Sequence, residues 1–168
     1  MNIAIFASGN GSNAQRITEY FHGNKLINTS LILSNRTDAY VLQRAKNLNV
    51  PAFVFTHSEL NNTCIVQNKL VEYQINFIVL AGFMLIIPFS LIKKFPKRMI
   101  NIHPALLPKF GGKGMYGEHV HKAVVAAREK ESGITIHFVN EKYDEGQIIF
   151  QAKCVVKKNE TPETLAVK

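Results

Sequence analysis

Short apolar runs and helical stripes alternate along the first hundred residues of the chain. The runs have the length of β-strands, and the stripes repeat every three or four residues, as one face of an α-helix does. The expected strands are Asn2–Ala7, Ser30–Ser34, Ala52–Phe55, Asn76–Ala81 and Met99–His103. The expected helices cover Ala14–Phe21, Val41–Leu48, Ser58–Tyr73 and Pro88–Phe95, the first of them capped by Ser12 or Asn13.

The order of these elements predicts the fold class. Asn76–Ala81 is almost continuously apolar, which is typical of a strand buried on both faces of a parallel sheet. Strand–helix alternation through five strands predicts an α/β fold with a doubly wound, mostly parallel, Rossmann-like sheet. Such sheets bind ligands outside the carboxyl ends of their strands. The loops expected to bind ligands are 8–13, 82–88, 103–117 and 140–146.

The pattern changes after Pro104. A Gly- and Pro-rich loop runs to Gly117, and a helical stripe follows it. Gly133–Asn140 and Gln147–Val156 then read as two strands with only a loop between them, so we expect an antiparallel C-terminal pair. Thr161–Lys168 has the cap and the proline of a helix start. The chain stops before that helix can finish, so we expect a natural C-terminal helix to be missing from a single domain spanning residues 1–168.

Composition narrows the class of partner. Of the 168 residues, 46% are hydrophobic and 19% charged, as in an ordinary globular protein. Twenty Lys and Arg residues against twelve Asp and Glu residues give a net charge of +8, which suits anionic ligands. The basic residues form only scattered doublets without interleaved aromatic residues. We therefore expect a small anionic substrate and no nucleic-acid partner.

The sequence shows neither a membrane-spanning segment nor a signal peptide, and this bears on the location of the protein. The longest apolar run, Phe77 to Ile87, is about half the length of a membrane span, so no membrane partner is expected. The N-terminus lacks the basic region of a signal peptide and reads as a first strand. Cys64 and Cys154 lie far apart and are expected to be reduced thiols in the core. These features predict a cytoplasmic protein.

A glycine-rich turn follows the first expected strand. Gly9-Asn10-Gly11-Ser12-Asn13-Ala14 fits G-x-G-x-x-A, a turn in which glycines and helix N–H groups approach an anion. A dinucleotide site also needs an acidic residue at the end of the second strand, where this chain has Ser34-Asn35-Arg36. A single phosphate fits the turn best. An NADP module that uses Arg36 for a 2′-phosphate stays an alternative, as does a plain strand-to-helix turn.

Two polar side chains close the fifth expected strand. Asn101 and His103 are two residues apart, so they face the same side of the strand, about 7 Å apart. A carboxamide beside an imidazole can stabilise an oxyanion while a proton moves. Asp144, in the turn between the last two strands, could partner a histidine. A structural histidine and an ordinary Asp-x-Gly turn are the alternatives.

Metal-binding and hydrolase motifs are absent from the sequence. His119 and His121 lie about 200° apart around a helix, and no C-x-x-C or H-E-x-x-H occurs, so we expect no metal. G-x-S-x-G, the nucleophile turn of serine hydrolases, is also missing.

Several blocks together resemble one enzyme family, the phosphoribosylglycinamide formyltransferases. These blocks are Ser8-Gly9-Asn10-Gly11-Ser12-Asn13, Leu80-Ala81-Gly82-Phe83-Met84, Asn101-Ile102-His103-Pro104-Ala105-Leu106-Leu107-Pro108-Lys109-Phe110, Gly133-Ile134-Thr135-Ile136-His137-Phe138-Val139 and Asp144-Glu145-Gly146. The N-I-H-P-x-L-L-P block is shared by enzymes that use formyltetrahydrofolate. The S-G-N-G-S-N start is similar to that of the glycinamide ribonucleotide enzymes in particular.

The resemblance implies roles for individual residues. By motif match, Asn101, His103 and Asp144 are the catalytic residues. Substrate-binding residues, for the phosphate of glycinamide ribonucleotide, are Gly11, Ser12 and Asn13. Residues that contact 10-formyltetrahydrofolate, the co-substrate, are Met84, Leu85, Ile86, Ile87 and Asn101. The family often has Arg where this chain has Leu85.

The implied reaction belongs to purine (IMP) biosynthesis. The amine of 5′-phosphoribosylglycinamide attacks the formyl carbon directly and gives a tetrahedral oxyanion. Asn101 and protonated His103 would stabilise this oxyanion, and Asp144 would raise the pKa of His103. The enzyme is expected to act as a monomer or homodimer. Other formyltetrahydrofolate-dependent formyltransferases and hydrolases share the three catalytic residues and stay alternatives, together with a non-catalytic NADP-binding module.

Overall fold

The chain folds into two compact units. The computed structural model describes residues 1–168, and the units are Met1–Met99 and Ile100–Lys168. The prediction of one domain that lacks a C-terminal helix stays a prediction.

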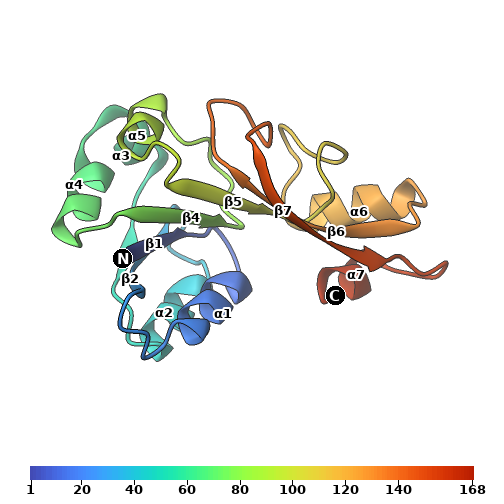
Figure 1. Cartoon of the computed structure of the whole chain (residues 1–168), viewed down its shortest axis with the longest axis horizontal. Helices are drawn as coiled ribbons and strands as arrows, with labels where there is room; N and C mark the ends of the chain where they lie inside the picture. Colours follow the sequence, from blue (N-terminus) through green and yellow to red (C-terminus); the bar gives the residue numbers. More distant parts are fainter. The chain divides into compact units, whose positions relative to one another are not determined.

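The first unit is a parallel sheet with helices on both of its faces. Its strands run in the order β3-β2-β1-β4, and every pair among them is parallel. Figure 1 shows α1 and α2 on one face of these strands and α3, α4 and α5 on the other. This arrangement confirms the doubly wound sheet. The elements are β1 (Asn2–Phe6), α1 (Ser12–Tyr20), β2 (Asn28–Ser34), α2 (Val41–Asn47), β3 (Ala52–Val54), α3 (His57–Asn62), α4 (Ile65–Glu72), β4 (Phe77–Ala81) and α5 (Phe89–Lys94).

Burial on both faces explains why the central strands are continuously apolar. Three consecutive residues of β1, Ala4, Ile5 and Phe6, are fully buried, so both faces of that strand are covered. At its carboxyl end the ring of Phe6 meets Phe55 at 5.8 Å and Phe83 at 5.3 Å between ring centroids, both edge-on. This aromatic cluster packs the strand end from which the glycine-rich turn leaves.

The cap of one helix and the continuity of another contradict the prediction for the first unit. The N-cap of α1 is Gly11, in the left-handed conformation, and not Ser12 or Asn13. The expected helix Ser58–Tyr73 is two helices, because Thr63 is extended and its hydroxyl donates to the Glu59 carbonyl at 2.9 Å. The same hydroxyl accepts the Ile65 N–H at 3.2 Å. A side chain that takes over these backbone groups ends one helix and begins the next.

The second unit confirms the antiparallel strand pair. β6 (Glu131–Phe138) pairs antiparallel with β7 (Ile148–Val155) and, on its other side, with β5 (Met99–His103). The helices α6 (Glu118–Ala126) and α7 (Pro162–Ala166) share a small core, which consists of Ala105, Val120, Val124 and Leu165. α7 begins as the sequence predicted, with Thr161 as its N-cap and Pro162 in its first turn.

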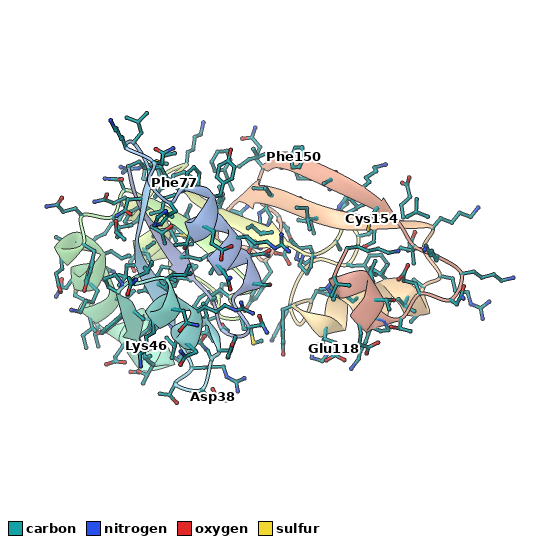
Figure 2. All side chains as sticks on the ribbon, turned by 90° about the horizontal axis from the view of Figure 1, so that it is seen from below. Asp38, Lys46, Phe77, Glu118, Phe150 and Cys154 are labelled. Atoms are coloured by element: carbon teal, nitrogen blue, oxygen red, sulfur yellow. The ribbon has the colours of Figure 1, made fainter.

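Both cysteines are free, but the prediction that both lie in the core was wrong for Cys64, which is exposed. Cys154 is half-buried on β7, where Figure 2 shows it on the same strand as Phe150.

Candidate active site

The glycine-rich turn presents unclaimed N–H groups at the start of α1. Gly11 caps the helix with φ +75°, and no side chain bonds to the first-turn amides. A Cβ on Gly11 would lie 2.3 Å from Cγ2 of Val41, so only glycine fits there. Ser12 and Asn13, the first residues of α1, are exposed. The turn therefore has the donors and the helix-dipole charge that an anion needs.

Arg44 of α2 holds this turn in place, and the sequence analysis missed it. Its Nε donates to the backbone carbonyl of Asn10 at 2.8 Å, and Nη2 donates to the Asn10 side chain at 2.7 Å. A guanidinium fork suits two oxygens in one plane. Arg44 also brings a positive charge beside the predicted phosphate turn.

Arg36, the residue that an NADP module would need, is already paired. Its Nε and Nη2 donate to the two carboxylate oxygens of Asp38 at 3.0 and 2.7 Å. This pairing occupies the guanidinium that would bind a 2′-phosphate, so it argues against the NADP alternative.

The segment Met84–Ile87 follows β4 and begins at an anchored position. The Met84 N–H donates to Oγ of Ser8 at 3.0 Å, and the Ser8 N–H donates to the Gly82 carbonyl at 3.0 Å. Met84 and Ile86 are exposed, whereas Ile87 is buried. Leu85 is half-buried. An exposed apolar ridge of this kind suits a flat aromatic ligand, because covering apolar surface contributes favourably to the free energy of binding.

The three predicted catalytic residues meet in the second unit. Asn101 and His103 lie on β5, and Asp144 lies in the loop between β6 and β7. Nδ2 of Asn101 donates to Oδ1 of Asp144 at 3.2 Å. Nδ1 of His103 lies 3.5 Å from Oδ2 of Asp144. The side chains that the sequence placed on one strand and in one distant turn thus form a single cluster.

His137 of β6 completes this cluster, and the sequence analysis missed its contribution. Its Nδ1–H donates to the carbonyl of Phe138 at 2.9 Å, and its Nε2 lies 3.1 Å from Nδ2 of Asn101. Oδ1 of Asp144 lies 3.5 Å from the same Nε2. Side chains alternate along β6, which puts Thr135 and His137 on one face of the strand, and this alternation was the sequence signal that could have indicated His137.

The pKa of His103 moves in the direction opposite to the prediction, because the side chain is buried. Burial lowers the pKa of the His103 imidazole below its ordinary value. The charge of Asp144 raises this pKa, as the sequence analysis expected, and so does the hydrogen bond to the Phe110 carbonyl, but together they do not offset burial. Only 2% of the His103 side chain is exposed, so the loss of hydration is large.

Asp144 stays ionised in the same surroundings. Burial alone raises the pKa of its carboxyl, but hydrogen bonds with His137 and with the Gly112 N–H lower it. The charges of His103 and His137 lower it further, and the pKa ends below its ordinary value. A carboxylate with several donors around it is held in its charged form.

Neither unit brings together three or more His, Cys, Asp or Glu side chains in an arrangement that could hold a metal ion. Independence from metals stays a prediction. None of the helices has the length and apolar character that a membrane crossing requires.

Comparison with known proteins identifies the family. The family model for formyl transferases matches residues 1–168. Phosphoribosylglycinamide formyltransferase of Haemophilus influenzae is 36% identical over 156 residues, which cover 90% of this chain and 71% of that protein. The chloroplastic enzyme of Arabidopsis thaliana is 42% identical over 170 residues, which cover 98% of this chain and 58% of that protein. The chain thus spans little more than half the length of this plant relative.

Solved structures agree with this assignment. Glycinamide ribonucleotide transformylase 1 from Symbiobacterium toebii superposes with a TM-score of 0.87 at 32% identity, covering 98% of this chain and 78% of that one. Phosphoribosylglycinamide formyltransferase from Streptococcus pneumoniae gives a TM-score of 0.85 at 35% identity, covering 99% and 88%. The chain belongs to the formyl transferase family and, within it, to the phosphoribosylglycinamide formyltransferases.

Proposed function

We propose that this chain transfers the formyl group of 10-formyltetrahydrofolate to the amine of 5′-phosphoribosylglycinamide, a step of de novo purine biosynthesis. The observation that carries the proposal is the cluster of Asn101, His103 and Asp144 in the second unit. Its relatives in Haemophilus influenzae and Escherichia coli bear the name of this activity. A cytoplasmic location and a monomeric or dimeric state stay predictions, and the two plant relatives are named chloroplastic.

The chemistry divides among the three side chains. Attack of the amine on the formyl carbon places a negative charge on the formyl oxygen, and hydrogen-bond donors must face that oxygen. Asn101 supplies a carboxamide N–H. His103 supplies an imidazolium N–H at Nδ1, because its Nε2 is engaged by the Phe110 carbonyl at 2.8 Å. In the ligand-free chain, Nδ2 of Asn101 is engaged by Asp144 and His137. Binding of the formyl oxygen therefore exchanges one of these internal hydrogen bonds for one to substrate.

His103 also moves a proton in the proposed reaction. The leaving folate nitrogen must gain a proton when the tetrahedral intermediate collapses, and the attacking amine must lose one. The imidazolium can donate the first proton, and the imidazole that it becomes can accept the second. Asp144 then stabilises the charged imidazole by its opposite charge, which is the role its distance from Nδ1 of His103 allows.

The first unit supplies the binding groups. We assign the substrate phosphate to the first-turn amides at Gly11, Ser12 and Asn13, whose donors no side chain claims. We assign the folate to the ridge Met84–Ile87, where exposed Met84 and Ile86 offer apolar contact. Since Leu85 carries no charge, this ridge has no cation at that position for the folate carboxylates.

The proposed function is tested by incubating the chain with glycinamide ribonucleotide and 10-formyltetrahydrofolate and following both formylated product and tetrahydrofolate. We expect the two products to appear in equal amounts and only when the amine substrate is present. Formate released without the amine substrate would identify a hydrolase. Transfer to methionyl-tRNA or to an amino sugar would identify a related formyltransferase.

Removal of metal ions is expected to leave this rate unchanged, because an imidazolium and an amide supply the oxyanion donors without a Lewis acid. The measurement compares the initial rate before and after exhaustive chelation and dialysis. A loss of activity that zinc or magnesium restores would overturn the proposed mechanism.

Replacing Gly11 by Ala is expected to raise the KM for glycinamide ribonucleotide roughly 10- to 100-fold, since hydrogen bonds to a charged group are each worth about 1.5–3 kcal/mol. The added Cβ would meet Cγ2 of Val41 at 2.3 Å and force the turn to move. Gly23→Ala is the matched control, because Gly23 lies outside the turn, has a similar φ of +74°, and a Cβ there meets nothing within 4 Å. Equal KM values for both variants would leave the turn as a plain connection.

A further inference from the structure

A three-residue backbone segment, Phe110–Gly112, reaches two of the three proposed catalytic side chains, His103 and Asp144. The Nε2–H of His103 donates a hydrogen bond to the carbonyl of Phe110 at 2.8 Å. The N–H of Gly112 donates to Oδ2 of Asp144 at 2.9 Å. This oxygen is the one that faces Nδ1 of His103 at 3.5 Å. One short stretch of backbone therefore touches the imidazole on one side and its carboxylate partner on the other.

Two residues of this segment have positive φ, and the third has no room for a side chain. Phe110 has φ +56°, a left-handed conformation that is an outlier for a bulky side chain. A Cβ on Gly111 would lie 2.5 Å from Cδ2 of Leu107 and 3.2 Å from Cβ of Asp144. Gly112 has φ +98°, which favours glycine. Backbone strain of this kind persists where surrounding structure over-determines it, commonly at active sites.

The loop of Asp144 is confined from the opposite side as well. Asp144 itself has φ +55°. A Cβ on Gly146 would lie 1.6 Å from the carbonyl oxygen of Phe138 and 3.2 Å from Nδ1 of His137. The carboxylate is thus held between β6 and the segment Phe110–Gly112, so a small displacement of either changes the distance to His103.

We propose that the backbone of Phe110–Gly112 is the positioning element of this catalytic site. Its carbonyl orients the His103 ring, and its N–H aims the Asp144 carboxylate at that ring. The kinetic part of this inference rests on the proposed formyl transfer, whereas the part that concerns ionisation does not depend on the substrate.

Each of the two backbone groups favours the charged form of the side chain that it contacts. The Phe110 carbonyl raises the pKa of His103 against burial, and the Gly112 N–H lowers the pKa of Asp144 against burial. Other groups face this pair: His137 from β6 lowers the pKa of both, and His121 from α6 lies near enough to His103 to feel its charge. Weakening the contact to Phe110 therefore lowers the pKa of His103, and weakening the contact to Gly112 raises the pKa of Asp144.

The test compares Gly112→Ala with Gly114→Ala in the ligand-free chain. Both glycines have positive φ, +98° and +87°, and a Cβ at either position meets nothing within 4 Å. The two substitutions carry a similar backbone strain, but only Gly112 touches Asp144. NMR titration of the Asp144 carboxyl carbon and the His103 ring reports both ionisations without any substrate.

For Gly112→Ala we expect the pKa of Asp144 to rise and that of His103 to fall, while Gly114→Ala leaves both near wild type. We expect kcat to drop about 10- to 100-fold, the effect of weakening one hydrogen bond to a charged group, with both KM values within twofold. Gly111→Ala displaces the same segment by direct contact and should move both titrations in the same directions.

Unchanged titrations in Gly112→Ala and Gly111→Ala, or equal shifts in Gly114→Ala, would overturn the inference. The NMR fingerprint of each variant shows whether it is folded, so loss of fold is separable from loss of positioning. Should all variants and the wild type lack formyl transfer, the titrations still decide the positioning role, while the proposed function alone fails.

Discussion

Asp144→Asn is expected to lower kcat by about 10²–10⁴, the usual range for a positioned acid–base group. The substitution keeps the shape of the side chain but removes its charge, which lies 3.5 Å from Nδ1 of His103. The buried imidazole then has no carboxylate to offset the loss of hydration. Because the phosphate turn and the apolar ridge belong to the first unit of the chain, the KM values are expected to change little.

The pH profile gives this prediction its sign. Burial already lowers the pKa of His103, and Asp144 is the larger of the two groups that raise it. Removing the carboxylate therefore lowers the pKa further. In the proposed mechanism the protonated imidazole is the active form, so activity is expected to fall as pH rises through this pKa. The limb that reports His103 is expected to move to lower pH in Asp144→Asn.

Glu145→Gln is the matched control for this experiment. Glu145 is the exposed neighbour of Asp144, and its carboxylate pairs with Lys142 at 3.1 Å, away from the histidines. Its kcat and its pH profile should match those of the wild type. A kinetically silent Asp144→Asn would reduce Asp144 to a turn residue and leave Asn101 and His103 as the catalytic groups.

His103→Ala is expected to be at least as severe as Asp144→Asn, because it removes both the oxyanion donor and the proton donor. The double variant should cost less than the product of the two single losses, since the side chains act as one unit. The measurement is kcat for wild type, both single variants and the double variant under the same conditions.

His119→Ala serves as the control for this cycle. His119 is exposed on α6 and its ring stacks edge-on against Tyr116 at 5.1 Å, so its loss should leave kcat near wild type. Losses that multiply in the double variant would show that His103 and Asp144 act independently. That outcome would contradict the ion-pair mechanism.

The sequence by itself determined most elements of the fold and the glycine-rich turn that leads into α1. The run Phe77–Ala81 leaves no polar position for a solvated face, so only a strand covered on both sides accommodates it. Glycine at position 11, between a strand and a helical stripe, indicates a turn that needs a positive φ or a close backbone approach. The pairing of the last two strands also followed, because a short loop without a helix permits only an antiparallel connection.

Some local features escaped the periodic pattern. The break between α3 and α4 depends on one hydroxyl of Thr63 replacing backbone partners. Threonine also occurs inside many continuous helices, so its presence does not predict a break. Val41 likewise excludes any side chain larger than hydrogen at Gly11, the cap of α1, and no local pattern reveals this contact.

The tertiary structure alone decided the electrostatics of the site. His137 joins Asn101 and Asp144 because strand register places it opposite Asn101, and register is a property of the pair of strands. The pKa of His103 moves down because burial outweighs the carboxylate, and burial depends on how the whole unit packs. The backbone groups of Phe110 and Gly112 carry no sequence signal, since every residue has a carbonyl and nearly every residue an N–H. Only the folded chain determines which of them meets a catalytic side chain.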